Sequence, residues 1–167
     1  KSNILYDALA VPSLGAEFKI GKKMTFDLSG QFCGWDVGSH KWKQWAVQPE
    51  LRYWPCRSFT GHFFGLHLLG GQYNFGNINL PFSFLGTNFR DLKDHRRQGW
   101  MAGAGVAYGY TWILSRRWSC EAEVGLGWLY TKYDVYECRD CGMKMREGIA
   151  HNYVGLTKAA LNIIYNF

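Results

Sequence analysis

Polar and apolar residues alternate one by one through much of this chain, and this pattern restricts it to β-structure. Successive side chains of a strand point to opposite faces, so each alternating run predicts a strand with one apolar and one polar face. The clearest runs cover residues 24–33, 45–52, 119–130 and 158–167. Two more predicted strands, 63–73 and 100–112, are rich in glycine, which suits a curved wall or a crowded interior.

The first twenty residues contain Pro12 and Ser13, a pair typical of a turn. We therefore expect a hairpin of two strands at 3–9 and 14–20. The split raises the strand count to eight, the even number that places both chain ends on one side of a membrane. The expected connections form two sets: short ones at 21–23, 55–60 and 115–117, and long ones at 34–44, 74–98 and 133–152.

The placement of charge separates a soluble barrel from one that faces lipid. Ionisable side chains of both signs lie on the polar face of the predicted strands, and the opposite face is almost free of charge. They form a predicted interior polar network of Asp7, Glu17, Lys19, Asp27, Glu50, Arg52, His67, Glu121, Glu123 and Lys158. Most tryptophans fall near strand ends, like the interfacial girdles of membrane barrels. A soluble barrel remains the alternative, with these charges on its outer wall.

These patterns predict an all-β fold: an eight-stranded antiparallel transmembrane β-barrel with short periplasmic turns and long extracellular loops. The length of 167 residues fits one domain, 1–167. No apolar stretch approaches the roughly 18 residues of a membrane-spanning helix. The net charge of +6 arises from short clusters such as Lys22-Lys23 and Arg116-Arg117. We interpret these as solvated turn charges and expect no nucleic-acid partner.

The sequence also resembles a known family along nearly its whole length. The matching segments are Lys1 to Ala8, Pro12 to Gly15, Gln48 to Trp54, Gly61-His62, Gly71 to Asn74, Gly105 to Tyr110 and Gly155 to Ala159. They resemble the small outer-membrane β-barrel family of Bacteroidota, a domain of unknown function. This resemblance implies an outer-membrane location, a multi-pass barrel and no assigned reaction. The alternating C-terminal end, with Ile163, Tyr165 and Phe167, is similar to the signal that the outer-membrane assembly machinery reads.

Cys138 and Cys141 form the one candidate metal motif, in a predicted long loop with His151 ten residues on. Zinc needs three or four such ligands brought together. Outside the cell a local disulfide between the two cysteines is the favoured interpretation, so we expect no metal and no cofactor.

Hydrolysis of a lipid would need a nucleophile, a histidine base and an orienting carboxylate. His67 is predicted to point inward near Glu50 or Glu121, but no inward serine is adjacent. We therefore expect no catalysis. Transport is also disfavoured, because an eight-stranded barrel is just wide enough for its own side chains.

The predicted loop at 74–98 combines an apolar part with a basic end. Its candidate interaction residues are Ile78, Phe82, Phe84, Arg96 and Arg97. The apolar part suits a partner protein, and the basic part suits lipopolysaccharide phosphates. We expect a structural or accessory subunit of a larger outer-membrane complex, for nutrient uptake or outer-membrane protein assembly. The alternatives are a stand-alone surface barrel whose loops bind a ligand or host surface, and a lipid-modifying enzyme.

Overall fold

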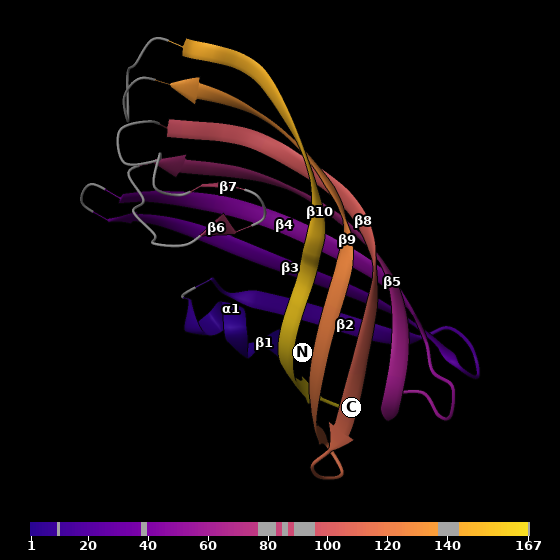
Figure 1. Ribbon diagram of the computed structural model, residues 1–167. Coiled ribbons are helices and arrows are strands. Elements are labelled where there is room, and N and C mark those ends of the chain that lie inside the picture. The colour runs from indigo at the N-terminus through magenta and orange to yellow at the C-terminus, as the bar shows by residue number, and fades with distance from the viewer. Residues whose placement is uncertain are drawn as a thin grey trace.

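The computed structural model describes residues 1–9, 11–37, 40–76, 83–84, 87–88, 96–136 and 144–166. Eight antiparallel strands form one sheet in the order β1-β10-β9-β8-β5-β4-β3-β2 (Figure 1). They are β1 Ser2–Asn3, β2 Ser13–Lys19, β3 Met24–Val37, β4 His40–Tyr53, β5 Gly61–Gly76, β8 Arg96–Ile113, β9 Trp118–Tyr136 and β10 Lys144–Tyr165. A short helix, α1 (Ile4–Ala8), follows β1, and β6 (Ser83–Phe84) pairs with β7 (Thr87–Asn88) in a separate two-stranded sheet.

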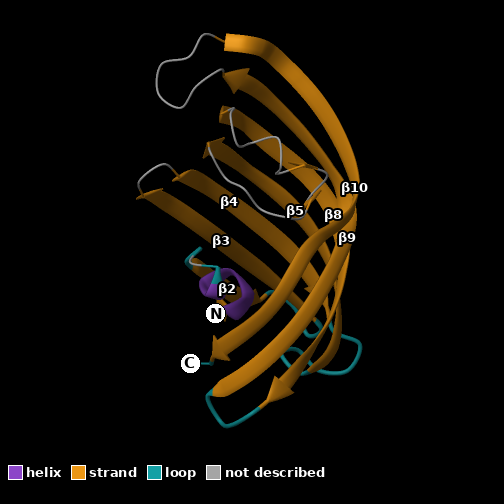
Figure 2. Cartoon of the chain, turned by 60° about the vertical axis from the view of Figure 1, so that its left-hand side comes forward, coloured by secondary structure: helices purple, strands orange, loops and turns teal. Residues whose placement is uncertain are grey.

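The sheet curls until its first and last strands meet. The backbone N–H of Gly15 in β2 donates to the carbonyl oxygen of Lys1 at 2.8 Å. The N–H of Asn3 in β1 donates to Ser13 Oγ at 2.8 Å. These contacts make the sheet a nearly closed barrel (Figure 2) and give both edge strands partners, which an open sheet would leave exposed.

Three short connections lie together at one end of the barrel, which we call the short-connection end. They join β2 to β3, β4 to β5 and β8 to β9. The N–H of Trp54 donates to the carbonyl of Lys23 at 2.8 Å, tying the first connection to the second. The N–H of Asn166 donates to the carbonyl of Arg117 at 2.8 Å, so the C-terminal end of β10 lies here too.

The alternation in the sequence becomes an inside and an outside of the barrel. Asp27, Glu50 and Arg52 are at most 1% exposed, whereas Leu28 and Val124 on the other face are 43% and 50% exposed. Charged side chains therefore line the interior and apolar side chains cover the outer wall. This confirms the predicted orientation of the two faces.

The strands run further than the alternation indicated. β3 continues to Val37 and β4 begins at His40, so most of the segment predicted as a long loop at 34–44 is strand. Similarly, β9 and β10 include 133–136 and 144–152. Those loop predictions were wrong because ladder hydrogen bonds between backbones need no apolar face, so a strand can continue where the alternation of polar and apolar residues ends.

The predicted strand at 3–9 is also wrong. After β1 the chain turns into α1, whose Asn3 cap accepts a hydrogen bond from Leu5 N through Oδ1 at 3.1 Å. The physical reason lies in the spacing: Ile4, Leu5 and Ala8 recur at helical rather than strand intervals. Within the described residues, no helix is long and apolar enough to cross a bilayer.

The strand pairing between β1 and β10 covers only two residues, and the Asn3 side chain extends it with further hydrogen bonds to β10. Its Nδ2 donates to the carbonyl of Ala159 at 3.3 Å, and its Oδ1 accepts from the N–H of Leu161 at 3.1 Å. One buried amide therefore caps the helix and pairs with two backbone groups of β10.

We expect Asn3→Ala to lower the free energy of unfolding by about 1–2 kcal/mol, because a helix cap and two strand contacts are lost together. Urea unfolding in detergent micelles, followed by tryptophan fluorescence, measures this change. Asn3→Asp keeps the accepting oxygen and should fall between wild type and Asn3→Ala. Equal stability of all three proteins would contradict the bridging role.

Candidate functional site: the interior charge network

Arg52 in β4 is the centre of a buried network of ion pairs. Its Nε donates to Glu50 at 2.6 Å, and its Nη1 donates to Glu17 at 2.8 Å. The two Nη atoms contact both oxygens of Glu121 at 2.9 and 3.1 Å, and Nη2 contacts Glu123 at 2.8 Å. Arg52 is fully buried. One guanidinium therefore joins carboxylates of β2, β4 and β9, using the fixed fork of donors that suits arginine to such sites.

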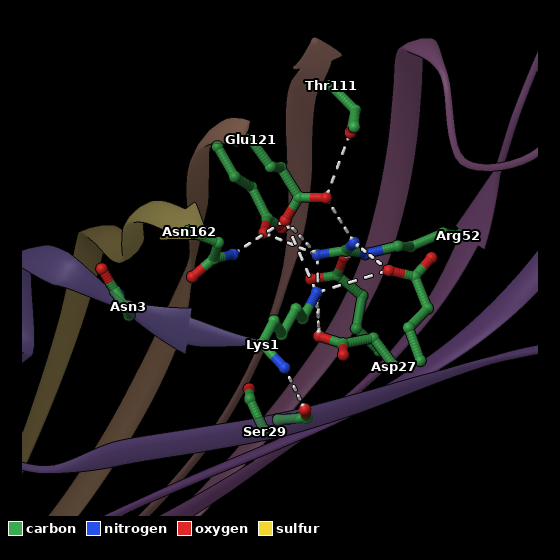
Figure 3. A network of polar contacts seen from close by, with 12 residues as sticks. Lys1, Asn3, Asp27, Ser29, Arg52, Thr111, Glu121 and Asn162 are labelled. Atoms are coloured by element: carbon green, nitrogen blue, oxygen red, sulfur yellow. Dashed lines mark hydrogen bonds and ion pairs between the residues drawn. The ribbon is translucent and has the colours of Figure 1, made fainter. Parts of the chain in front are cut away.

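Two lysines complete the charged part of the network. Lys158 in β10 binds Glu50 at 2.5 Å and Glu123 at 3.0 Å. Lys1 binds Asp27 at 3.0 Å (Figure 3). Lys1 Nζ also lies 3.4 Å from Glu17 and 3.5 Å from Glu121.

Neutral side chains orient the carboxylates of this network. Asn162 Nδ2 donates to Glu121 at 2.8 Å, and Thr111 Oγ1 donates to the same carboxylate at 3.2 Å (Figure 3). Thr25 Oγ1 donates to Glu17 at 2.6 Å and accepts from the Trp54 indole at 2.8 Å. Glu17 and Glu121 are thereby held by hydrogen bonds as well as by charge, which offsets the cost of burying them.

His67 in β5 extends the network along the barrel. Its Nε2 lies 2.9 Å from Thr157 Oγ1, and its Nδ1 lies 4.0 Å from Glu50. A β-bulge between Leu156 and Lys158 turns both Thr157 and Lys158 into the interior, where they are 8% and 5% exposed. An ordinary strand would send one of these neighbours outward.

The Thr157, His67 and Glu50 side chains lie in the order of a catalytic triad but lack its geometry. A working triad needs the base to hydrogen-bond its carboxylate, and 4.0 Å is too long for that bond. Glu50 is already held by Arg52 and Lys158. The arrangement therefore links strands of the barrel.

Helix α1 places Tyr6 close to this network. Burial raises the pKa of the Tyr6 hydroxyl, and the negative charge of Glu123 raises it further. Both effects disfavour ionisation of this phenol.

Glycines make room for the buried side chains. A Cβ at Gly105 would lie 2.5 Å from the carbonyl oxygen of Leu126 and 2.8 Å from His67 Nε2. A Cβ at Gly65 would lie 2.6 Å from a carboxylate oxygen of Glu50. Glycine is thus required at Gly65 and Gly105 by the close approach of network side chains and, at Gly105, of the neighbouring strand.

Most members of the predicted interior network meet in the structure. Glu17, Asp27, Glu50, Arg52, Glu121, Glu123 and Lys158 share ion pairs, and His67 lies beside Glu50. Asp7 and Lys19 are placed differently. Asp7 lies in α1 and accepts from Ser2 Oγ at 2.5 Å and from Ser13 N at 3.1 Å. Lys19 is exposed at the end of β2.

Sequence reasoning missed Lys1 and the neutral members of the network. Thr25 and Asn162 share the polar face of their alternating runs, so that signal was present in the sequence. Lys1 precedes the first predicted strand, and no alternating pattern included it. The bulge that turns Thr157 inward had no sequence signal that we recognised.

Other predicted site residues lie wholly or partly outside the described residues. Cys138, Cys141, Ile78, Phe82 and Phe167 are outside them. Phe84, Arg96 and Arg97 belong to strands β6 and β8. Ile163 and Tyr165 in β10 are 40% and 37% exposed on the outer wall. In the part of the chain that the structure describes, no three His, Cys, Asp or Glu side chains are grouped to hold a metal ion.

Fold and site together define a class: a small, nearly closed antiparallel β-barrel whose interior holds a network of buried ion pairs. The family model described as "Protein of unknown function (DUF3575)" matches residues 1–167. The chain therefore belongs to this family, which confirms the predicted membership of a family of unknown function. No curated protein and no solved structure matches the chain.

We expect Arg52→Ala to destabilise the barrel by about 3–5 kcal/mol, because it leaves several buried carboxylates without their cation. Asp27→Asn should cost far less, because the network holds five carboxylates but only three cations. Urea unfolding in micelles compares the two variants. Similar losses from both would contradict the central role of Arg52.

Gly105→Ala and Gly70→Ala form a matched pair within the glycine-rich strands. A Cβ at Gly70 would meet nothing within 4 Å, whereas one at Gly105 clashes with backbone and with His67. We expect Gly105→Ala to lower the unfolding free energy by about 1–3 kcal/mol and Gly70→Ala to leave it nearly unchanged. The same urea titration measures both, and a reversed order would refute the packing argument.

Proposed function

We propose that this protein is an integral outer-membrane β-barrel that acts as a structural or accessory subunit of a larger outer-membrane complex. The observation that carries the proposal is the inverted distribution of polarity. Arg52 and Glu121 are fully buried, while Phe18, Leu66 and Leu126 are each 59% exposed. A barrel in water would gain by the opposite arrangement, whereas a lipid environment stabilises this one.

Aromatic side chains border the apolar outer wall at two levels. Trp100 and Trp128 lie near one border, and Trp112, Trp118 and Tyr165 lie near the other, all between 37% and 48% exposed. Twelve residues of β8 separate Trp100 from Trp112, about 40 Å of strand, or about 30 Å along the axis at a tilt near 40°. That height suits a bilayer core with interfacial aromatics at both edges.

The interior network supports the accessory role over a pore. Side chains of β2, β4, β9 and β10 meet around Arg52 and Lys158 and cross the interior of the barrel near its short-connection end. This leaves the outer wall and the connections between strands as surfaces for partners. Nutrient uptake and outer-membrane protein assembly are the processes that we propose such a complex serves.

Val124→Arg tests the membrane placement. Val124 lies midway between the two aromatic levels on β9, so an arginine there should lower stability in lipid vesicles by about 2–4 kcal/mol. Ile113→Arg, beside Trp112 at one border, should cost only about 0–1 kcal/mol. Urea titration of the vesicle-inserted protein, with folding followed by the heat-modifiable gel shift, measures both. A folded chain that stays monodisperse in buffer without detergent would overturn the proposal.

The accessory role is tested separately in cells. Gentle detergent extraction from the native membrane, then native gels and mass spectrometry, should show the chain with larger outer-membrane proteins. A lone species of about 19 kDa would favour the stand-alone surface barrel. Altered lipids in a deletion strain would favour the lipid-modifying enzyme.

A further inference from the structure

The short-connection end carries a cluster of cations without any acidic residue. The β2–β3 connection contains Lys22 and Lys23, the β4–β5 connection contains Arg57, and the β8–β9 connection contains Arg116 and Arg117. With Lys19 at the end of β2, these six exposed residues form what we call the basic rim. None of the three connections contains Asp or Glu.

The basic rim directly borders the apolar outer wall. Ile20, two residues before Lys22, is 57% exposed, and Leu114, two residues before Arg116, is 67% exposed. Trp118, directly after Arg117, is 48% exposed. Cations placed one or two residues beyond exposed apolar side chains are at the depth where lysine and arginine reach lipid headgroups.

The positive charge of the rim is not neutralised from within the barrel. The nearest network carboxylates, Glu17 and Glu121, have side chains only 6% and 0% exposed and are bound by Arg52 and Lys1. Lys23 and Arg117 donate to neutral oxygens, those of the Pro55 carbonyl and the Tyr165 hydroxyl. Among the described residues, the charged ends of Lys22, Arg57 and Arg116 have no partner.

We propose that the basic rim binds the anionic phosphate headgroups of glycerophospholipids in the leaflet at the short-connection end, which is the periplasmic leaflet. This proposal rests on the outer-membrane placement proposed above. The three connections spread the cations around the barrel beside the apolar wall, which matches a surrounding ring of headgroups better than one acidic protein patch. Each cation near an anionic lipid surface strengthens binding by about fivefold.

The test compares three proteins in nanodiscs that contain phosphatidylglycerol and phosphatidylethanolamine. The neutral variant carries Lys22→Gln, Arg57→Gln and Arg116→Gln, and its matched control carries Lys22→Arg, Arg57→Lys and Arg116→Lys. Native mass spectrometry of the released barrels counts the lipids of each class that stay bound. We expect wild type and control to retain phosphatidylglycerol preferentially, and the neutral variant to lose about tenfold or more of that preference. High salt should weaken the preference of wild type.

Two results would overturn the inference and leave the membrane placement intact. The first is insertion of wild type without a preference for phosphatidylglycerol. The second is an equal preference for phosphatidylglycerol in wild type and the neutral variant. Failure of wild type to insert into vesicles of any composition would instead refute the proposed function.

Discussion

The burial of Arg52 constrains the rest of this barrel more than any other interaction. A guanidinium removed from water costs several kcal/mol unless carboxylates replace its hydration, and here Glu17, Glu50, Glu121 and Glu123 do so. These residues belong to strands on opposite sides of the barrel. Any slip of one strand by one residue would turn its carboxylate to the outer wall, so the network selects one register among many that backbone hydrogen bonds alone would allow.

The irregular features of the fold follow from accommodating that network. The bulge in β10 brings Thr157 to His67 and Lys158 to Glu50 from consecutive positions. Gly65 and Gly105 lack the Cβ that would meet Glu50 and His67. Weak local strand preference at a glycine is therefore offset by ion pairs that could not form around a larger residue.

How far the sequence predicts this structure depends on the type of signal. Asp27, Glu50 and Glu121 were predicted to point inward because side-chain direction in a strand follows from counting residues. The helical spacing of Ile4, Leu5 and Ala8 covers little more than one turn, which is too short to identify a helix in advance. Asn3 completes the helix with contacts to Ala159 and Leu161, far away in sequence. Lys1 reaches the network because the barrel closes between its N-terminal residues and β2. No local sequence pattern encodes that closure.

The formal net charge of this molecule is the sum of two sets of charges that lie in different places, one buried in the interior and one exposed at the short-connection end. The interior network holds two more carboxylates than cations, and the basic rim holds six cations and no carboxylate. The buried charges are paired with opposite charges at close range, so their fields largely cancel outside the barrel. The exposed charges of the rim act over roughly a Debye length, about 8–10 Å. A partner at the short-connection end therefore meets a field set by the rim, although the chain as a whole is only +6. Within the described residues, the stability of the barrel thus depends on one set of charges, and its electrostatic surface at this end depends on another.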